Sequence, residues 1–253
     1  MTYSLRKIII PVLLVLTASA VFAQTPDMDK ILKEIDELRN FEDTDFSCVY
    51  TIVSEKPGEE RSVTEALMFR RDAKDQYVML IRKPDVQRGQ GYLMVDDNVW
   101  FYDPDSREFE HSSLSENVTD SEAKNSDFNR NSLSEDYNVE SWEESELGGK
   151  AVYILNLKAK TTDVSYDRMK IWVRQDVTIV LKSEEYGFSG NLMRTTGYFN
   201  YVKLSDNKYI PTQMLLVDHL NVGEKTQVTL KSPSLKKIPD DVFEKSYLER
   251  VNQ

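Results

Sequence analysis

Residues 77–102 contain three apolar runs in close succession, Tyr77-Val-Met-Leu-Ile81, Tyr92-Leu-Met-Val95 and Val99-Trp-Phe-Tyr102. Aromatic and aliphatic runs of this length, bounded by turn residues such as those at 96–98, predict strands. A strand of an antiparallel sheet usually alternates apolar and polar residues, because one face meets water. These runs are apolar on both faces. We therefore expect one face to bound a cavity or to lie under a covering segment, with a plainly packed β-domain as the alternative.

The strand pattern extends in both directions from this stretch and continues to residue 230. Hairpin-length turns such as Lys56-Pro-Gly58 and Ser205-Asp-Asn207 separate the runs, and this favours one antiparallel meander over parallel βαβ units. We predict a mainly β, α+β fold with a single antiparallel sheet of about 11–13 strands, which must curl or close because a flat sheet that wide leaves unpaired edges. The predicted strands are 46–54, 62–71, 76–83, 91–95, 99–103, 108–112, 137–146, 150–159, 166–174, 179–186, 192–203, 209–218 and 225–230.

A short amphipathic helix precedes the strands. Pro26 is typical of a helix start, and Ile31, Leu32, Ile35 and Leu38 recur at helical spacing, which gives one apolar face about three turns long. The helix is predicted either to pack on a core or to cover the mouth of the sheet. These two roles are compatible.

An acidic segment interrupts the strands. Residues 114–146 hold ten acidic side chains against Lys124 and Arg130. We predict that residues 114–136 form a mobile or partly helical insertion with Phe128 and Leu133 as apolar anchors. Long loops in compact domains are often functional lids, so we interpret this one as a lid, with a solvated surface loop as the alternative.

The N-terminus has the features of a secretory signal peptide. Arg6 and Lys7 precede the apolar run 8–16, and Val21 and Ala23 stand at the positions that a signal peptidase reads. We predict cleavage after Ala23, export to the periplasm of a bacterium and no lipid anchor, because no cysteine follows the junction. The run is shorter than the ~20 residues of a transmembrane helix, which is the alternative.

Composition excludes several classes of protein. The net charge is −11, and removal of residues 1–23 leaves 30 basic against 43 acidic side chains, so a nucleic-acid partner is not expected. Cys48 alone forms no internal disulfide, and two histidines, His111 and His219, have no metal-ligand spacing. We predict no metal and no cofactor.

No catalytic motif is complete. The stretch Gly187-Phe-Ser-Gly190 is one residue short of the nucleophile elbow G-x-S-x-G, and it falls in a predicted hairpin turn rather than at a strand-to-helix turn. No nucleophile and base are paired at a recognisable spacing. The chain is therefore predicted not to be an enzyme, and an esterase acting on lipids is the least favoured alternative.

An ordered set of motifs carries a family resemblance over residue 28 to the C-terminus. The motifs are Gly89-Gln-Gly-Tyr-Leu-Met-Val-Asp-Asp-Asn-Val-Trp-Phe-Tyr-Asp-Pro104, Asn125-Ser-Asp-Phe128, Ile171-Trp-Val173, Tyr209-Ile-Pro-Thr212, Thr226-Gln-Val-Thr-Leu230, Ile238-Pro-Asp-Asp-Val-Phe243 and Tyr247-Leu-Glu-Arg250. With these motifs in this order, the sequence resembles the outer-membrane lipoprotein-sorting protein family, the LolA-like periplasmic carriers, and is closest to its longer branch. The family's usual Leu-Pro after residue 176 is replaced by Thr178-Ile-Val-Leu181, and the acidic insertion is heavier than in the family.

The resemblance implies a strongly curved, incomplete β-barrel over residues 24–253 that is closed by short helices and encloses an apolar cavity for acyl chains. It implies a carrier for lipoproteins or lipids such as phospholipid, which takes cargo from an inner-membrane complex (an ABC or RND-type exporter) towards an outer-membrane acceptor. Burial in a portable cavity removes acyl CH₂ groups from water, at ~0.8 kcal/mol each.

The predicted acyl-chain site is rich in methionine, which suits variable ligands. A shift of one residue in the register of a strand moves every side chain to the opposite face, so the sequence pattern leaves both faces of each strand open as the lining face. The predicted lid residues are Ile31, Ile35 and Leu38. The predicted lining residues are Met68, Met79, Tyr92, Met94, Trp100, Tyr102, Trp172, Met193, Tyr198, Met214 and Leu216.

A non-carrying function is the alternative for the whole chain. The same sheet, filled by its own side chains, could serve as an envelope interaction or sensor module that docks on a lipid exporter. Bound lipid in the purified protein distinguishes the two.

Overall fold

The computed structural model describes residues 26–95 and 98–251. The predicted signal peptide, with its cleavage point after Ala23, lies outside the described residues, as do two of the three residues of the predicted turn at 96–98. Of the helices within the described ranges, none has the length and apolar character that a bilayer-spanning segment needs.

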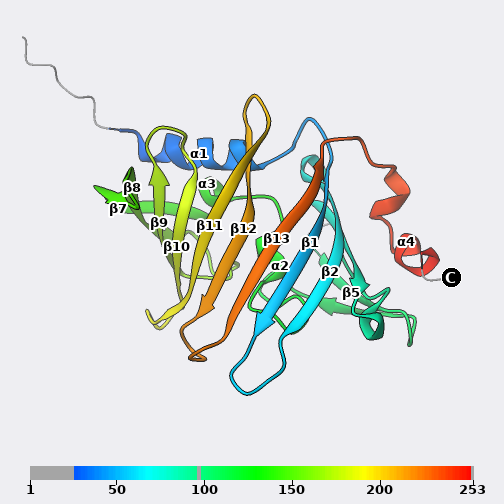
Figure 1. The fold of residues 1–253 in the computed structure, drawn as a ribbon. Helices are drawn as coiled ribbons and strands as arrows, with labels where there is room; N and C mark the ends of the chain where they lie inside the picture. Colours follow the sequence, from blue (N-terminus) through cyan, green and yellow to red (C-terminus); the bar gives the residue numbers. More distant parts are fainter. Residues whose placement is uncertain (1–25, 96–97, 252–253) are drawn as a thin grey trace, which may run out of the picture.

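Within the described residues, thirteen strands form one antiparallel sheet, which confirms the predicted fold class and strand number (Figure 1). The spatial order is β6-β5-β4-β3-β2-β1-β13-β12-β11-β10-β9-β8-β7. The strands are β1 Phe46–Glu55, β2 Ser62–Arg71, β3 Gln76–Lys83, β4 Gly91–Val95, β5 Asn98–Asp103, β6 Glu108–Ser112, β7 Tyr137–Leu147, β8 Lys150–Ala159, β9 Arg168–Arg174, β10 Val180–Tyr186, β11 Leu192–Ser205, β12 Lys208–Asp218 and β13 Lys225–Ser234.

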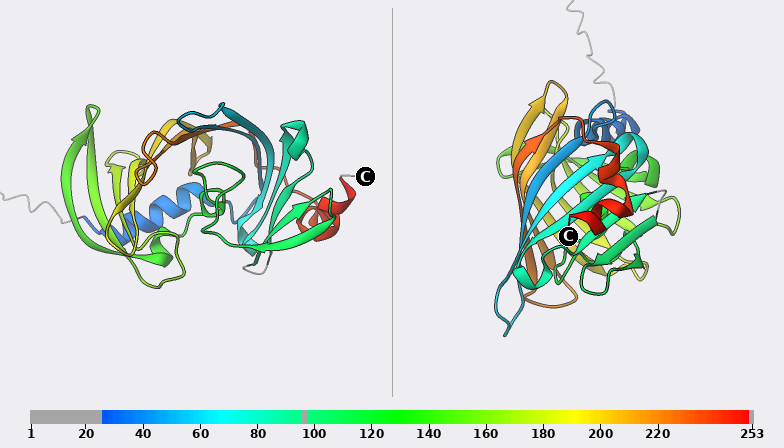
Figure 2. Two further views of the ribbon diagram at one scale, coloured as in Figure 1. Left: turned by 90° about the horizontal axis from the view of Figure 1, so that it is seen from below. Right: turned by 90° about the vertical axis from the view of Figure 1, so that its right-hand side faces the viewer.

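The first and last strands pair in the middle of the sheet. Tyr50 of β1 lies opposite Leu230 of β13, and the sheet runs outward from this pair to β6 on one side and β7 on the other. The sheet arches strongly but does not close, so it has a concave and a convex face (Figure 2).

Short helices occupy the connections and the two ends of the chain. Asp27 caps α1 by accepting a hydrogen bond from the Lys30 amide at 3.1 Å, and α1 lies inside the arch near β7–β10 (Figure 2). The α-helices are α1 Met28–Arg39, α2 Asn125–Phe128, α3 Leu133–Asp136 and α4 Lys245–Arg250, and the 3₁₀ turns are η1 Asp72–Lys74, η2 Asp85–Gln87 and η3 Asp240–Phe243.

Both faces of β3 and β4 are covered, by different parts of the chain. Tyr77 and Met79 point into the concave face, where residues 113–136, here called the covering segment, pack on them. Val78 and Leu80 point to the convex face and contact residues 235–251, here called the C-terminal segment. Figure 2 shows the C-terminal segment outside the arch. This double cover accounts for the strands that are apolar on both faces.

Candidate functional site: the concave face

The covering segment fills much of the concave face with apolar side chains. Val118 and Ala123 are 0 % exposed and Phe128 is 1 % exposed. The ring of Phe128 meets Tyr50 edge-on, with the centroids 5.0 Å apart. The segment also contains the two short helices α2 and α3, and of the two predicted apolar anchors Phe128 is buried and Leu133 is half-buried. It is a packed cover and not a solvated loop.

An ion pair fixes the covering segment to the sheet. Arg194 of β11 donates to both carboxylate oxygens of Asp127, at 2.7 and 2.8 Å, and to the backbone carbonyl of Glu122 at 3.0 Å. On the other side of the arch, the amide of Thr119 donates to the Tyr92 hydroxyl at 2.9 Å. The segment is therefore held by polar contacts at separate points along its length.

The surroundings of Arg194 keep it charged. Burial alone would lower the pKa of this guanidinium, but the charges of Asp127 and Glu185 outweigh that effect and raise it. Glu185 lies 3.3 Å from Arg194 Nε and is 1 % exposed, and burial raises the pKa of its carboxyl. A charge this deeply buried is costly unless it is paired, so the three side chains form one interdependent group.

A second polar junction ties the covering segment to α1. Asn40 and Asn131 exchange two hydrogen bonds of 2.7 Å each, and Asn131 also donates to Asp36 at 2.6 Å. Asp36 accepts further bonds from the amides of Leu133 and Ser134, and so caps the start of α3. The end of α1 and the covering segment are thus positioned together.

A cavity of about 160 Å³ remains between the covering segment and the sheet. One part of its wall is apolar, with Met214 and Leu216 of β12, and another part is polar, with Arg39, Asp127 and Arg194. A smaller cavity of about 20 Å³ adjoins Tyr50 and Met214. Drug-sized ligands occupy roughly 300–1,000 Å³, so a long acyl chain requires displacement of the covering segment.

Three carboxylates meet where the covering segment crosses the end of the sheet. Oxygens of Glu122, Asp218 and Glu224 all lie within 4.8 Å of one another. Burial, a hydrogen bond shared with Asp218 and the nearby acid charges raise the pKa of Glu122 to about 7. Glu122 is therefore largely protonated below neutral pH, and it contacts its acid neighbours in that form.

Comparisons with known proteins agree with this geometry. A family model whose description reads "uncharacterized protein" matches residues 73–250, which is more than half of the chain. The chain belongs to that family. No curated protein matches the sequence significantly.

Solved structures supply the fold comparison. A LolA superfamily protein from Nitrosomonas europaea is 25 % identical with a TM-score of 0.75, over 86 % of this chain and 97 % of that one. The fold is LolA-like. A domain described as an outer membrane lipoprotein-sorting protein, from Vibrio parahaemolyticus, is 19 % identical with a TM-score of 0.78, over 88 % and 98 %. A DUF1329 family protein from Desulfovibrio piger is 20 % identical with a TM-score of 0.78, over 87 % and 97 %. The family resemblance seen in the sequence is confirmed.

The LolA-like sheet divides the predicted lining residues between its two faces. Most of them pack on the concave face, and three of these line the cavity of about 160 Å³, namely Tyr198, Met214 and Leu216. The concave members are Met68, Met79, Tyr92, Met94, Tyr198, Met214 and Leu216.

The other four predicted lining residues belong to the convex face. Tyr102 packs with the C-terminal segment, and the Lys245 ammonium lies 3.3 Å from the Trp100 ring centroid. Trp172 packs with Val152 and Ile154 outside the arch. Met193 precedes the inward-facing Arg194 and so points outward. The four therefore cannot share a concave cavity with Met79 and its neighbours.

The predicted lid helix is placed over the concave face near β7–β10. Ile35 is 1 % exposed and Ile31 packs at the edge of the same cluster, which includes Leu155 and Ile171. Leu38 is half-buried and belongs to none of the buried apolar clusters of the described residues. Of the three residues, Ile35 makes the fullest contact.

Sequence reasoning missed the charged groups of the concave face. Arg194 lies in a strand beside Thr195 and Thr196, a pattern that is typical of a solvated surface. The informative signal is the alternation of side chains along the strand. Every second residue of β11 points to the same face, so Arg194 and Thr196 share a face with Tyr198, which is among the predicted lining residues. An arginine on the same face as a lining tyrosine marks a buried polar site.

Proposed function

We propose that the chain is a periplasmic carrier that binds the acyl chains of a lipoprotein or lipid on its concave face for transfer towards the outer membrane. One observation carries this proposal: the apolar concave face is covered by a loop segment and not by a second sheet. A loop segment that is held by side-chain packing and by separate polar contacts can leave this face without breaking a ladder of strand hydrogen bonds, which a second sheet would have to do. The LolA-like fold supports the same function.

The acyl chain replaces the covering segment in this proposal. Displacement of Val118 and Phe128 exposes methionines such as Met68, Met79 and Met94, whose flexible side chains adapt to chains of different length. Each CH₂ buried there contributes ~0.8 kcal/mol, which offsets the lost contacts of the covering segment. The remaining proposed lining residues are Tyr92, Tyr198, Met214 and Leu216.

Helix α1 acts as the lid at the other end of the site. Ile31, Ile35 and Leu38 are the proposed lid residues, and Asp36 and Asn40 join this helix to the covering segment. Movement of one therefore transmits to the other. The function is binding and release, without catalysis.

Export and transfer partners complete the proposal. We infer a signal peptide over 1–23 and a carrier domain over 24–253, with the covering segment corresponding to the predicted insertion at 114–136. The partners are an inner-membrane transport complex, of the ABC or RND-type exporter class, and an outer-membrane acceptor. An acidic chain of net charge −11 suits lipid or protein partners better than nucleic acid.

Native mass spectrometry of protein purified without detergent tests the proposal, followed by solvent extraction and by titration with a fluorescent fatty acid. A stoichiometric acyl lipid, or saturable uptake of the fatty acid, is the expected result. An empty protein that also takes up no fatty acid contradicts the carrier function and favours the envelope interaction module.

A matched pair of variants locates the site. Met214→Trp fills the concave cavity, whereas Met193→Trp makes the same change on the convex face. We expect uptake to fall at least about tenfold in the first and to stay unchanged in the second, with near-UV circular dichroism confirming the fold of both. Equal effects in the two variants contradict a concave site.

A further inference from the structure

Arg39 lines both of the cavities described above. It is the last residue of α1, it is half-buried, and its side chain contributes to the walls of both cavities, as do Asp127 and Met214. Its guanidinium carbon lies 5.6 Å from the centre of the Tyr198 ring. The side chain is therefore fixed on an aromatic face beside the apolar wall of β12.

Arg39 differs from the other interior arginines in that it makes no ion pair with an acidic side chain of the described residues. Arg70, which lines the smaller cavity with it, pairs with Asp72 at 2.6 Å. Arg194 pairs with Asp127, whose two oxygens are thereby occupied. Among the described arginines, three make no ion pair, and the other two, at positions 82 and 107, are exposed.

The fold alone does not account for this arrangement. A cation in the last turn of α1 interacts favourably with the helix dipole. An arginine whose side chain points to water would have the same interaction, so the dipole does not explain why Arg39 faces the cavities. Arg39 instead lines two cavities, and its guanidinium, a group with five N–H donors, lies beside the Tyr198 ring. A half-buried guanidinium without a carboxylate partner can form charge-assisted hydrogen bonds with an anion supplied by a ligand.

We infer that Arg39 binds the anionic group, a carboxylate or a phosphate, of the amphiphile whose acyl chain lies on the concave face. This inference rests on the proposed carrier function and adds the chemical class of its ligand. The charged group sits at Arg39, and the chain extends along Met214 and Leu216 of the same cavity. A chain with a net charge of −11 does not attract anions in general, so selectivity for them requires a local cation.

Three probes with the same twelve-carbon chain test the inference: laurate, lauroyl lysophosphatidic acid and neutral lauryl alcohol. Each is titrated at pH 8 against the neutral dye N-phenyl-1-naphthylamine bound to the protein. We expect at least one anionic probe to bind at least about tenfold more tightly than the alcohol. Preference for laurate alone or for the phosphate alone supports the inference and identifies the headgroup.

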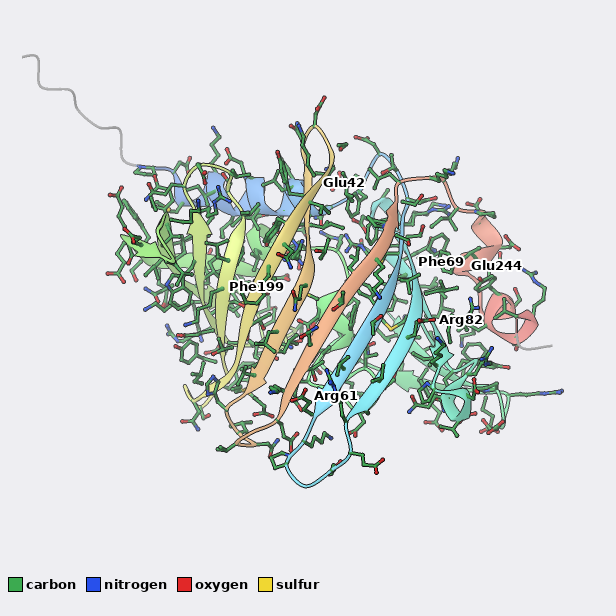
Figure 3. The ribbon with its side chains drawn as sticks, viewed as in Figure 1. Glu42, Arg61, Phe69, Arg82, Phe199 and Glu244 are labelled. Atoms are coloured by element: carbon green, nitrogen blue, oxygen red, sulfur yellow. The ribbon has the colours of Figure 1, made fainter. Side chains whose placement is uncertain are left out.

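Variants assign the preference to Arg39. Arg39→Gln is expected to bring anionic and neutral probes to equal affinity, whereas Arg39→Lys keeps most of the preference. Arg82→Gln removes the same charge from an exposed position on β3, labelled in Figure 3, and is expected to change nothing. Affinity for the alcohol stays constant in all variants and reports an intact cavity.

The outcomes separate this inference from the carrier function. Equal binding of all three probes by the natural protein, or a preference that survives Arg39→Gln, overturns the role of Arg39 and leaves the carrier standing. Failure to bind any probe contradicts the carrier itself. If Arg39→Gln does not fold, the inference is tested on the natural protein by measuring how salt changes the preference for anionic over neutral probes. A preference that is the same at low and high salt overturns the inference.

Discussion

Arg194 and Asp127 form a two-pronged ion pair, with N–O distances of 2.7 and 2.8 Å, between the floor of the arch and the segment that covers it. Arg194 is 5 % exposed, so the pair works in a poorly hydrated environment. Such pairs add little net stability compared with apolar packing, but loss of one partner is expensive. The pair therefore specifies where the covering segment sits.

Asp127→Asn is expected to loosen the covering segment. The amide cannot accept two charged hydrogen bonds from Arg194, and the local cost is about 1.5–3 kcal/mol. Hydrogen exchange of residues 113–136 should accelerate by roughly 10–100-fold while β1 and β13 stay protected. Asp176→Asn, in an exposed pair with Arg174, serves as the control and should change neither region. Uniform loss of protection would mean that the segment does not open separately.

Phe128→Ala is expected to leave an empty space beside Tyr50, which lines the smaller of the two cavities. Phe128 is 1 % exposed and packs on Tyr50, so its truncation should lower the free energy of unfolding by about 3–5 kcal/mol. The same change should increase uptake of a fluorescent fatty acid, because the chain no longer displaces a ring. Phe188→Ala, at an exposed turn, should alter neither quantity. Reduced uptake by a folded Phe128→Ala protein would contradict displacement of the segment.

Neutral Glu122 is expected to make the cover sensitive to pH. Its pKa in the folded protein is about 7 against an ordinary value of 4.5, so the stability that it contributes is complete below about pH 4.5 and is lost as the pH rises through 7. Above that pH, three negative charges face one another, and the cations near them are Lys124, Lys56 and Arg194. Hydrogen-exchange protection of residues 113–136, corrected for the intrinsic rate, should fall over this range.

Two variants check the assignment to Glu122. Glu122→Gln should remove the fall in protection between pH 4.5 and 7, and Glu59→Gln, on an exposed turn, should leave it in place. The same pH dependence in the Glu122→Gln protein would show that another group is responsible.

Asp45→Asn is expected to destabilise the attachment of the C-terminal segment. Asp45 accepts from Arg71 at 2.9 and 3.0 Å and from the Ile238 amide at 2.6 Å, and Arg71 also stacks on Phe243. Loss of this buried pair should cost about 3–5 kcal/mol in urea unfolding. Asp241→Asn, in an exposed pair with Arg250, is the control.

The pH profile of the same site has the opposite sign to that of Glu122. Burial raises the pKa of Asp45, but the bonds from Arg71 and Ile238 outweigh it and lower the pKa overall. The stability that Asp45 contributes is present above its ordinary pKa of 3.8 and is lost as the pH falls through the lowered value. Asp45→Asn should flatten the acid limb of the stability curve, and an unchanged limb would exclude this carboxylate as its source.

The strands were predictable because each is local in the sequence. Short turns and apolar runs define them, and the thirteen predicted runs correspond to the thirteen observed strands. The faces were not predictable to the same degree. A run such as Val99-Trp-Phe-Tyr102 has no alternation, so nothing local shows that Trp100 and Tyr102 point outward while Val99 points inward.

Segments that are distant in the sequence cover the strands and determine which side chains are buried on each face. The outer side of β3 and β4 is apolar because residues 235–251, about 150 positions later in the chain, lie on it. The buried charges escape prediction for a related reason. Arg194 and Asp127 are 67 residues apart, and each looks like a surface residue in its own segment. Their pairing depends on the arch that brings β11 under α2.

The connection between the two outermost strands has a kinetic consequence. Residues 113–136 link β6 directly to β7, so both ends of the cover stay attached to the sheet whenever its middle leaves. A molecule that binds inside the arch competes with the covering segment, which stays tethered at both ends and therefore has an effective concentration on the order of millimolar. In the proposed carrier, the protein's own segment therefore competes continuously with any bound molecule and lowers its apparent affinity.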